Sequence, residues 1–185
     1  MIANYFFNKQ HRFPTKFLPY YDGLNDYSSV ASHSTIDNIF HTGGTVFTSY
    51  RVRGRPQSDP MLWAKTDGLT KGSYLQLFGS GTAGVIYFFH LFSTTAGLWT
   101  LNYNFNYAIP EEMRIVVAYD ASDVANDPVI HLNGQKYHTG DGSLIEFSTP
   151  VGAVVSDAGI PLILGMSSAG ANINSCNGEI WDVGM

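Results

Sequence analysis

Two carboxylates close to the C-terminus are the first candidates for catalysis. Retaining glycoside hydrolysis needs two carboxyl groups about 5 Å apart, one acting as nucleophile and the other as acid/base. Glu179 and Asp182 stand three positions apart in the sequence, and Trp181 lies between them. Residues three apart on a strand face opposite sides of the sheet. We therefore expect no functional carboxylate pair, and a glycoside hydrolase is only a remote alternative.

Two glycine-containing segments resemble known functional turns, the first a dinucleotide-binding turn and the second a nucleophile elbow. Gly79, Gly81 and Gly84 have the spacing of a dinucleotide-binding turn, which needs a helix after it to hold the pyrophosphate. The next residues, 85–89, are Val-Ile-Tyr-Phe-Phe and predict a strand, so the glycines favour a hairpin. Residues 165–169 approximate a nucleophile elbow, but a polar loop follows where an elbow requires a helix. The sequence predicts a protein that is not an enzyme and that uses no organic cofactor.

Acidic residues gather in two turns, and carboxylate oxygens are the ligands that calcium prefers. The first pair is Asp22 and Asp26, and the second pair is Asp120 and Asp123. Neither pair has the spacing of an EF-hand loop, and Asp is also an ordinary residue of turns. The six histidines show no metal-ligand spacing. Calcium is therefore the one metal that the sequence suggests, with turn capping as the alternative.

A strictly alternating segment, residues 99–108, offers amide groups for ligand binding. Its aromatic and aliphatic side chains occupy every second position, so they share one face of a strand. The amides share the other face: Asn102, Asn104 and Asn106. Amides can exchange hydrogen bonds with sugar hydroxyls, and an exposed indole, Trp63 or Trp181, can stack on a pyranose. A glycan site is thus one interpretation, and a solvated outer face is the other.

The first 21 residues differ from the rest of the chain. They carry three basic side chains and no acidic one, which leaves 7 basic and 15 acidic side chains in the remainder. Rings are frequent and two prolines exclude a continuous helix. Two interpretations stay open: a first strand that packs on its own domain, or an arm that docks on a neighbouring subunit. The docking residues would be Tyr5, Phe6, Phe7, Lys9, Arg12, Phe13, Lys16 and Phe17.

Length and composition bound the class of protein. The chain has 185 residues, of which 44% are hydrophobic, 14% aromatic and only 14% charged, so disorder and coiled coil are excluded. The net charge of -5 argues against a nucleic-acid binder. The longest apolar run, residues 85–92, is too short to cross a bilayer, and the N-terminus lacks the pattern of a signal peptide. Cys176 is the only cysteine, so no internal disulfide can form.

Many short strands separated by turns are predicted for the rest of the chain, with almost no helix. The Asn133-Gly134 pair between two strand-like runs is a strong hairpin signal. Such a pattern is typical of a β-sandwich or barrel. The predicted strands cover residues 45–53, 61–65, 74–78, 85–92, 99–108, 113–119, 129–132, 144–147, 162–164 and 179–183.

Three stretches, taken in order, resemble the laminin G-like, concanavalin A-like jelly-roll family. The first is Tyr-Tyr-Asp-Gly-Leu-Asn-Asp-Tyr at 20–27, which is similar to that family's opening strand. The second is Arg-Ile-Val-Val-Ala-Tyr-Asp at 114–120 with Pro-Val-Ile-His-Leu-Asn-Gly at 128–134, and the third combines 161–165 with 177–183. The resemblance implies an all-β, two-sheet antiparallel jelly-roll sandwich over residues 20–185, preceded by an arm or first strand at 1–19.

The same resemblance implies a function without catalysis. Relatives of this kind bind glycans or proteins, and some occur in bacteriophage particles. We therefore expect a structural or interaction module, an accessory decoration or tail-associated subunit of a phage-like virion, that docks through its N-terminal arm. The expected partners are proteins of a larger assembly, a second copy of the chain among them. A lectin-like carbohydrate-binding module is the alternative, and we expect neither nucleic-acid binding nor membrane insertion.

Overall fold

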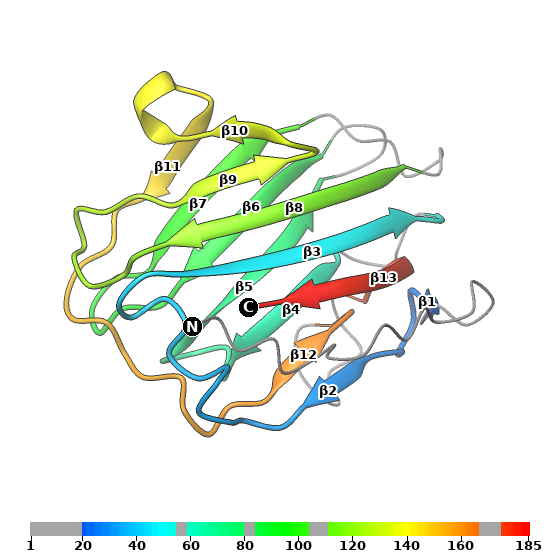
Figure 1. Cartoon of the computed structure of the whole chain (residues 1–185), viewed down its shortest axis with the longest axis horizontal. Helices are drawn as coiled ribbons and strands as arrows, with labels where there is room; N and C mark the ends of the chain where they lie inside the picture. Colours follow the sequence, from blue (N-terminus) through cyan, green and yellow to red (C-terminus); the bar gives the residue numbers. More distant parts are fainter. Residues whose placement is uncertain (1–19, 55–58, 80–83, 104–110, 167–174) are drawn as a thin grey trace.

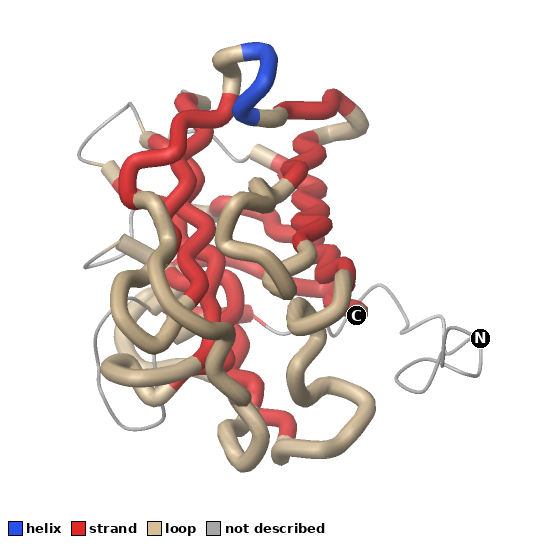
Figure 2. Tube along the Cα trace, turned by 90° about the vertical axis from the view of Figure 1, so that its left-hand side faces the viewer, coloured by secondary structure: helices blue, strands red, loops and turns tan. Residues whose placement is uncertain are grey.

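The computed structural model is a sandwich of two antiparallel β-sheets, as the sequence predicts (Figures 1 and 2). It describes residues 20–54, 59–79, 84–103, 111–166 and 175–185. The six-stranded sheet has the order β1 (Tyr20–Asp22), β13 (Asn177–Gly184), β3 (Gly44–Val52), β8 (Glu112–Tyr119), β9 (Val129–Leu132) and β10 (Gln135–Tyr137). The seven-stranded sheet has the order β11 (Leu144–Ser148), β7 (Gly97–Asn102), β6 (Val85–His90), β5 (Gly72–Phe78), β4 (Met61–Thr66), β12 (Leu162–Leu164) and β2 (Ser28–Val30).

Side-chain alternation along the strands builds the core between the two sheets. In β6, Ile86 and Phe88 point inward and are fully buried, whereas Tyr87 and Phe89 point outward and keep part of their surface exposed. The same rule holds in β7, where Trp99 is buried and the amide of Asn102 is exposed, as the alternating pattern predicts.

Aromatic rings fill one part of this core. Phe88 stacks on Trp99 with ring centroids 5.7 Å apart, and Tyr119 meets both rings edge to face. Phe40, from the loop before β3, packs edge-on against Phe88 at 5.4 Å. Full burial of such a side chain stabilises a fold by about 1.5–3 kcal/mol, so the abundant rings of the sequence supply much of the folding energy.

Tight turns join neighbouring strands at the predicted places. The Asn133-Gly134 hairpin between β9 and β10 is confirmed, with φ values of 52° and 86°. Both values are positive, as a type I′ turn requires, and glycine adopts such a conformation without strain. Gly79 and Gly84 lie between β5 and β6, so a strand and not a helix follows the glycine-rich segment.

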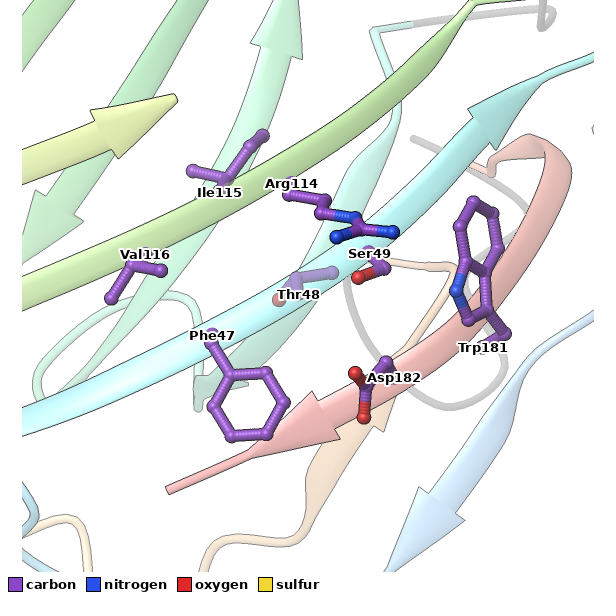
Figure 3. A pocket seen from close by; sticks show the side chains of 8 residues that line it. All are labelled: Phe47, Thr48, Ser49, Arg114, Ile115, Val116, Trp181 and Asp182. Carbon is purple, nitrogen blue, oxygen red and sulfur yellow. The ribbon is translucent and has the colours of Figure 1, made fainter. Parts of the chain in front are cut away.

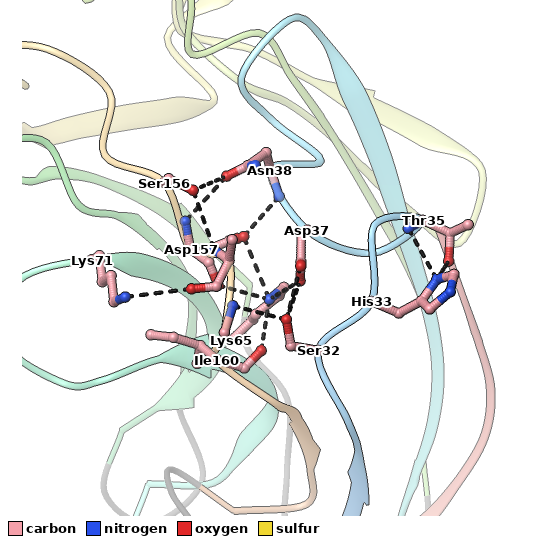
Figure 4. A network of polar contacts seen from close by, with 12 residues as sticks. Ser32, His33, Thr35, Asp37, Asn38, Lys65, Lys71, Ser156, Asp157 and Ile160 are labelled. Carbon is pink, nitrogen blue, oxygen red and sulfur yellow. Dashed lines mark hydrogen bonds and ion pairs between the residues drawn. The ribbon is translucent and has the colours of Figure 1, made fainter.

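A buried lysine ties β4 to two loops that are distant in sequence (Figure 4). Lys65 Nζ lies 2.8 Å from Asp37 Oδ1 and 3.4 Å from Asp157 Oδ1, and it donates to the backbone carbonyls of Asp157 and Ile160 at 3.0 and 2.7 Å. Burial raises the pKa of the Asp37 carboxyl, but hydrogen bonds from Lys65 and Ser32 outweigh burial and hold this pKa below its usual value. All three N–H donors of the Lys65 ammonium thus have acceptors, so the network stabilises the packing of the two loops against β4.

His90 is buried among aromatic rings at the end of β6. Phe40, Phe92 and Tyr119 meet its imidazole edge to face, with centroids 5.1–6.0 Å away. Neither ring nitrogen has a hydrogen-bond partner in the part of the chain that the structure describes. Burial, with a smaller contribution from His41, lowers the pKa of His90 to about 4, so the ring is neutral at pH 7.

The helical content is a single 3₁₀ turn, η1 (Thr139–Asp141), within the described ranges. None of the helical structure in those ranges has the length and hydropathy needed to span a membrane.

Candidate binding groove

The outer face of the six-stranded sheet carries several charged side chains, from β13, β3 and β8. Side chains that lie opposite each other in antiparallel strands share a face. Ser49 of β3 lies opposite Arg114 of β8, and Phe47 lies opposite Val116. The alternating residues of β8, such as Ile115, point into the core. This register therefore places Phe47, Ser49 and Arg114 together on the outer face.

A β-bulge at Trp181 completes this surface. Ile180 of β13 lies opposite Tyr50 and Asp182 lies opposite Ser49, so Trp181 is the extra residue of the bulge. Because Glu179 lies opposite Arg51, which shares the face of Ser49, Glu179 and Asp182 both point outward. The prediction that these two carboxylates face opposite sides is wrong, since the bulge shifts the alternation by one residue.

These side chains enclose a shallow groove of about 300 Å³ across β13, β3 and β8 (Figure 3). Trp181 forms one wall, and Phe47 and Asp182 lie toward the other end of the groove. The guanidinium of Arg114 extends across β3 above Ser49 in the direction of Trp181. The described residues that line it, hereafter the binding groove, are Phe47, Thr48, Ser49, Arg114, Ile115, Val116, Trp181 and Asp182.

Ion pairs at one end of the groove hold its indole wall. Glu179 accepts from Arg51 Nη1 at 3.1 Å and from Arg53 Nη2 at 2.8 Å, so both of its carboxylate oxygens are engaged. Arg51 also reaches Glu112 at 3.2 Å, and its guanidinium carbon lies 5.3 Å from the centre of the Trp181 ring. Partly exposed pairs of this kind contribute little energy, but together they restrict the position of the indole.

Two charged side chains of the groove, in contrast, have no partner among the described residues. Among the residues that the structure describes, the side chains of Arg114 and Asp182 make no hydrogen bond and no ion pair. The groove therefore offers a free cationic donor, a free anionic acceptor and an aromatic wall. Such a set can bind polar groups on a ligand that also presents an apolar surface.

A second, more open depression of about 750 Å³ continues from the groove toward the β9–β10 hairpin. It shares Arg114 and Val116 with the binding groove and adds Glu112, His131, Asn133 and Gly134. The backbone N–H of Arg114 donates to Asn133 Oδ1 at 2.9 Å, which fixes the hairpin against β8. A ligand that is longer than the binding groove can thus extend along the sheet surface into this depression.

The described residues of the groove do not include a pair of free carboxylates. Both oxygens of Glu179 are held by arginines, and Asp182 is the only carboxylate in its lining. Glycoside hydrolysis by the two-carboxylate mechanism needs a second carboxyl group that is free to exchange a proton.

Three of the residues predicted for glycan binding lie in the described structure, and it does not bring them together. Trp181 lines the groove, whereas Asn102 is exposed on the outer face of the other sheet. Trp63 is only 1% exposed and packs in the core near Phe40 and Phe88, so the prediction that it can stack on a sugar is wrong. Trp63 lies opposite the buried Leu75 of β5, and this register turns its indole inward. Asn104 and Asn106 lie outside the described residues.

The predicted calcium ligands cap their own turns. Asp26 Oδ2 accepts from the Asp22 N–H at 3.0 Å, and Asp22 Oδ1 accepts from the Leu24 N–H at 2.8 Å. Asp120 and Asp123 likewise accept from backbone N–H groups two residues further on, at 3.0 and 2.9 Å. No group of three or more His, Cys, Asp or Glu side chains in the described ranges is placed to hold a metal ion. Turn capping, the alternative, accounts for these carboxylates.

The N-terminal docking residues are not part of the described structure. Residues 1–19 lie outside it, so the prediction for Tyr5, Phe6, Phe7, Lys9, Arg12, Phe13, Lys16 and Phe17 stays a prediction. The next residues begin β1, which pairs with β13, and Tyr21 is buried in the core.

Arg114, Ser49 and Phe47 were not singled out as site residues from the sequence. The alternation around Arg114, between Met113 and Ile115, is sufficient to place its side chain on an outer face. Its groove neighbours come from strands far away in the chain, and only the sheet order β13-β3-β8 brings them together.

Comparison with known proteins supports the fold. No protein-family model matches the sequence, and no curated protein matches it either. Among solved structures, a similar one is that of the mouse laminin alpha1 chain, domains LG4-5, with a TM-score of 0.56 and 14% sequence identity. The match covers 89% of this chain and 40% of that chain. At this identity the likeness shows the fold alone, and the chain is an all-β, two-sheet jelly-roll sandwich of the laminin G-like kind, as the sequence predicts.

Proposed function

We propose that the protein is a non-catalytic interaction module that binds a polar ligand in the groove across β13, β3 and β8. One observation carries this proposal: an indole wall stands beside two oppositely charged side chains that have no partner in the described structure. The laminin G-like fold is compatible with a binding role, although a fold by itself does not determine a function.

A glycan is the ligand class that this combination suits. A pyranose ring has an apolar face that stacks on an indole, and its hydroxyl groups both donate and accept hydrogen bonds. Arg114 would donate to a sugar oxygen, and Asp182 would accept from a sugar hydroxyl. The proposed glycan site thus lies on the outer face of the six-stranded sheet, whereas Asn102 lies on the outer face of the other sheet.

A glycan array tests the site with matched variants. We expect the full chain to be retained by a restricted set of glycans, and Trp181→Ala and Arg114→Ala each to weaken retention at least tenfold. Leu69→Ala is the control, because Leu69 is 84% exposed in the β4–β5 turn and belongs to neither depression. Retention that both groove variants leave unchanged would exclude this site, and an array without any retained glycan would exclude the ligand class.

We also propose that the module is an accessory subunit of a larger assembly, such as a phage-like virion, and that residues 1–17 dock it there. The support is compositional, since a basic, ring-rich segment precedes a body of opposite charge. Deletion of residues 1–17 should weaken co-sedimentation with the particle fraction of the source cells. Unchanged co-sedimentation of the truncated protein would contradict the docking role.

A further inference from the structure

The outer face of the seven-stranded sheet is covered by apolar and aromatic side chains. Tyr74 and Phe78 of β5 lie opposite Phe89 and Val85 of β6, and Phe89 lies opposite Leu98 of β7. Edge strand β11 adds Ile145, opposite Thr100, and Phe147, which is the extra residue of a bulge just before Ser148, the residue opposite Leu98. This surface, hereafter the aromatic face, consists of Tyr74, Phe78, Val85, Tyr87, Phe89, Leu98, Ile145 and Phe147.

Its rings are held in fixed pairs. Tyr74 and Phe89 stack with centroids 4.6 Å apart, and Phe78 and Tyr87 stack at 4.9 Å with an interplanar angle of 9°. Burial by these neighbours raises the pKa of the Tyr74 hydroxyl above its ordinary value. Rings that are already ordered lose little conformational entropy when a partner covers them.

Large apolar side chains nevertheless stay open to solvent on this face. Phe78, Ile145 and Phe147 are 42%, 44% and 74% exposed. Monomeric proteins rarely expose a contiguous apolar patch of this kind unless it serves as a contact surface. The exposed apolar side chains of the aromatic face therefore indicate a surface that contacts another molecule.

Charge is missing from the centre of this face. Strands β5, β6 and β7 contain no Asp, Glu, Lys or Arg, and their outward polar side chains are the neutral Gln76, Thr100 and Asn102. The outer face of the other sheet, in contrast, carries Arg51, Glu112, Arg114, Glu179 and Asp182. The two faces of one sandwich thus have opposite characters, although both lie on the molecular surface.

We propose that the aromatic face binds the same face of a second copy of this chain, so that two sandwiches pack back to back. Each copy has a net charge of -5, so two copies repel each other at long range, and a contact surface without charged groups adds no local like-charge repulsion to this. A two-fold axis places the same patch on both sides, and a neutral patch satisfies that condition without like-charge contacts. Apolar sheet faces also pack on each other about 10 Å apart in ordinary sandwiches.

The size of the face is sufficient for a reversible dimer. Four strands about 4.8 Å apart and about six residues long cover roughly 400 Å² in projection. Protruding rings raise the accessible area above that figure, toward the roughly 600–800 Å² per partner of a small specific interface. We therefore expect a dimer whose population depends on protein concentration.

Sedimentation velocity over a range of concentrations tests this proposal on the full chain. The wild-type protein should shift from monomer to dimer, and Phe147→Glu and Phe147→Lys should each weaken the dimer at least tenfold. Either charge would be buried against an apolar surface that offers it no counter-charge. Phe147 is largely solvent-exposed in the single chain, so its replacement should leave the fold intact, which circular dichroism checks.

The matched control is Phe47→Glu, the same substitution on the outer face of the other sheet. It should leave the monomer–dimer equilibrium unchanged. A wild-type chain that stays monomeric up to about 1 mM would overturn the proposal. A dimer that survives both Phe147 variants would also overturn it, and a dimer that instead disappears on deletion of residues 1–17 would assign the contact to that segment.

Discussion

Asp182 lies opposite Ser49 across β13 and β3, with its carboxylate on the outer face of the sheet. In an uninterrupted register, Asp182 would lie opposite Thr48, whose side chain is buried. A carboxylate at that inward position would lose its hydration without gaining a partner, at a cost of several kcal/mol. The bulge at Trp181 thus keeps the carboxylate in solvent and supplies the aromatic wall of the binding groove.

Deletion of Trp181 should remove the wall but preserve the fold. The register of Ile180 opposite Tyr50 and Asp182 opposite Ser49 needs no residue between them once the bulge is lost. We expect the free energy of unfolding in urea to fall by only about 1 kcal/mol, mainly from the lost contact with Arg51. Deletion of Ile180 is the control, since it forces an indole into a packed core site and should cost roughly 3 kcal/mol. Equal losses for the two deletions would contradict the assigned bulge.

Replacement of Lys65 by Met should destabilise the sandwich strongly. The substitution leaves the carboxylates of Asp37 and Asp157 partly buried without their shared cation. Breaking a buried pair in this way costs about 3–5 kcal/mol. Lys71→Met should change the free energy of unfolding by less than about 0.5 kcal/mol, because among the described residues the Lys71 ammonium donates only to the carbonyl of Ala158, at 3.4 Å. Urea denaturation measures the free energy of unfolding of both variants, and similar losses for the two would contradict the stabilising role of the Lys65 network.

His90 should make the fold sensitive to mild acid. Its folded-state pKa of about 4 lies below the usual 6.5, so the unfolded chain binds more protons between these values. The free energy of unfolding should therefore decrease as the pH falls from about 6.5 toward 4, by up to roughly 3 kcal/mol. Urea titrations of wild type and His90→Leu should diverge over this window, since the leucine variant lacks that proton uptake. His131→Gln, on the outer sheet face, should follow the wild type, and parallel curves for all three proteins would contradict the prediction.

Cys176 should be unreactive in the folded protein. The thiol is fully buried, and burial raises its pKa far above the ordinary value, so almost no thiolate forms. A chromogenic disulfide reagent should label one thiol per chain in urea and none in native buffer over the same time. Complete labelling of the native protein would show that this part of the core opens readily.

Local patterns were sufficient to predict most of the fold. Period-two alternation placed Trp99 inside and Asn102 outside, and the Asn133-Gly134 pair located a hairpin, because these features depend only on neighbours in sequence. The bulge at Trp181 was missed, since one extra residue is visible only against the paired strand. The partners of Lys65 were missed for the same reason, because Asp157 lies 92 residues away in the chain. Trp63 was misplaced because ring identity alone does not show which face of a strand is buried.

Quenching of tryptophan fluorescence by acrylamide tests the binding groove most directly. Trp63 and Trp99 are buried, and Trp181 is the partly exposed indole among the three, so it dominates the quenchable emission. With a glycan retained on the array at saturating concentration, we predict that the quenching constant falls toward the value of a Trp181→Phe variant. A bound glycan that leaves the wild-type quenching constant unchanged would contradict binding at Trp181.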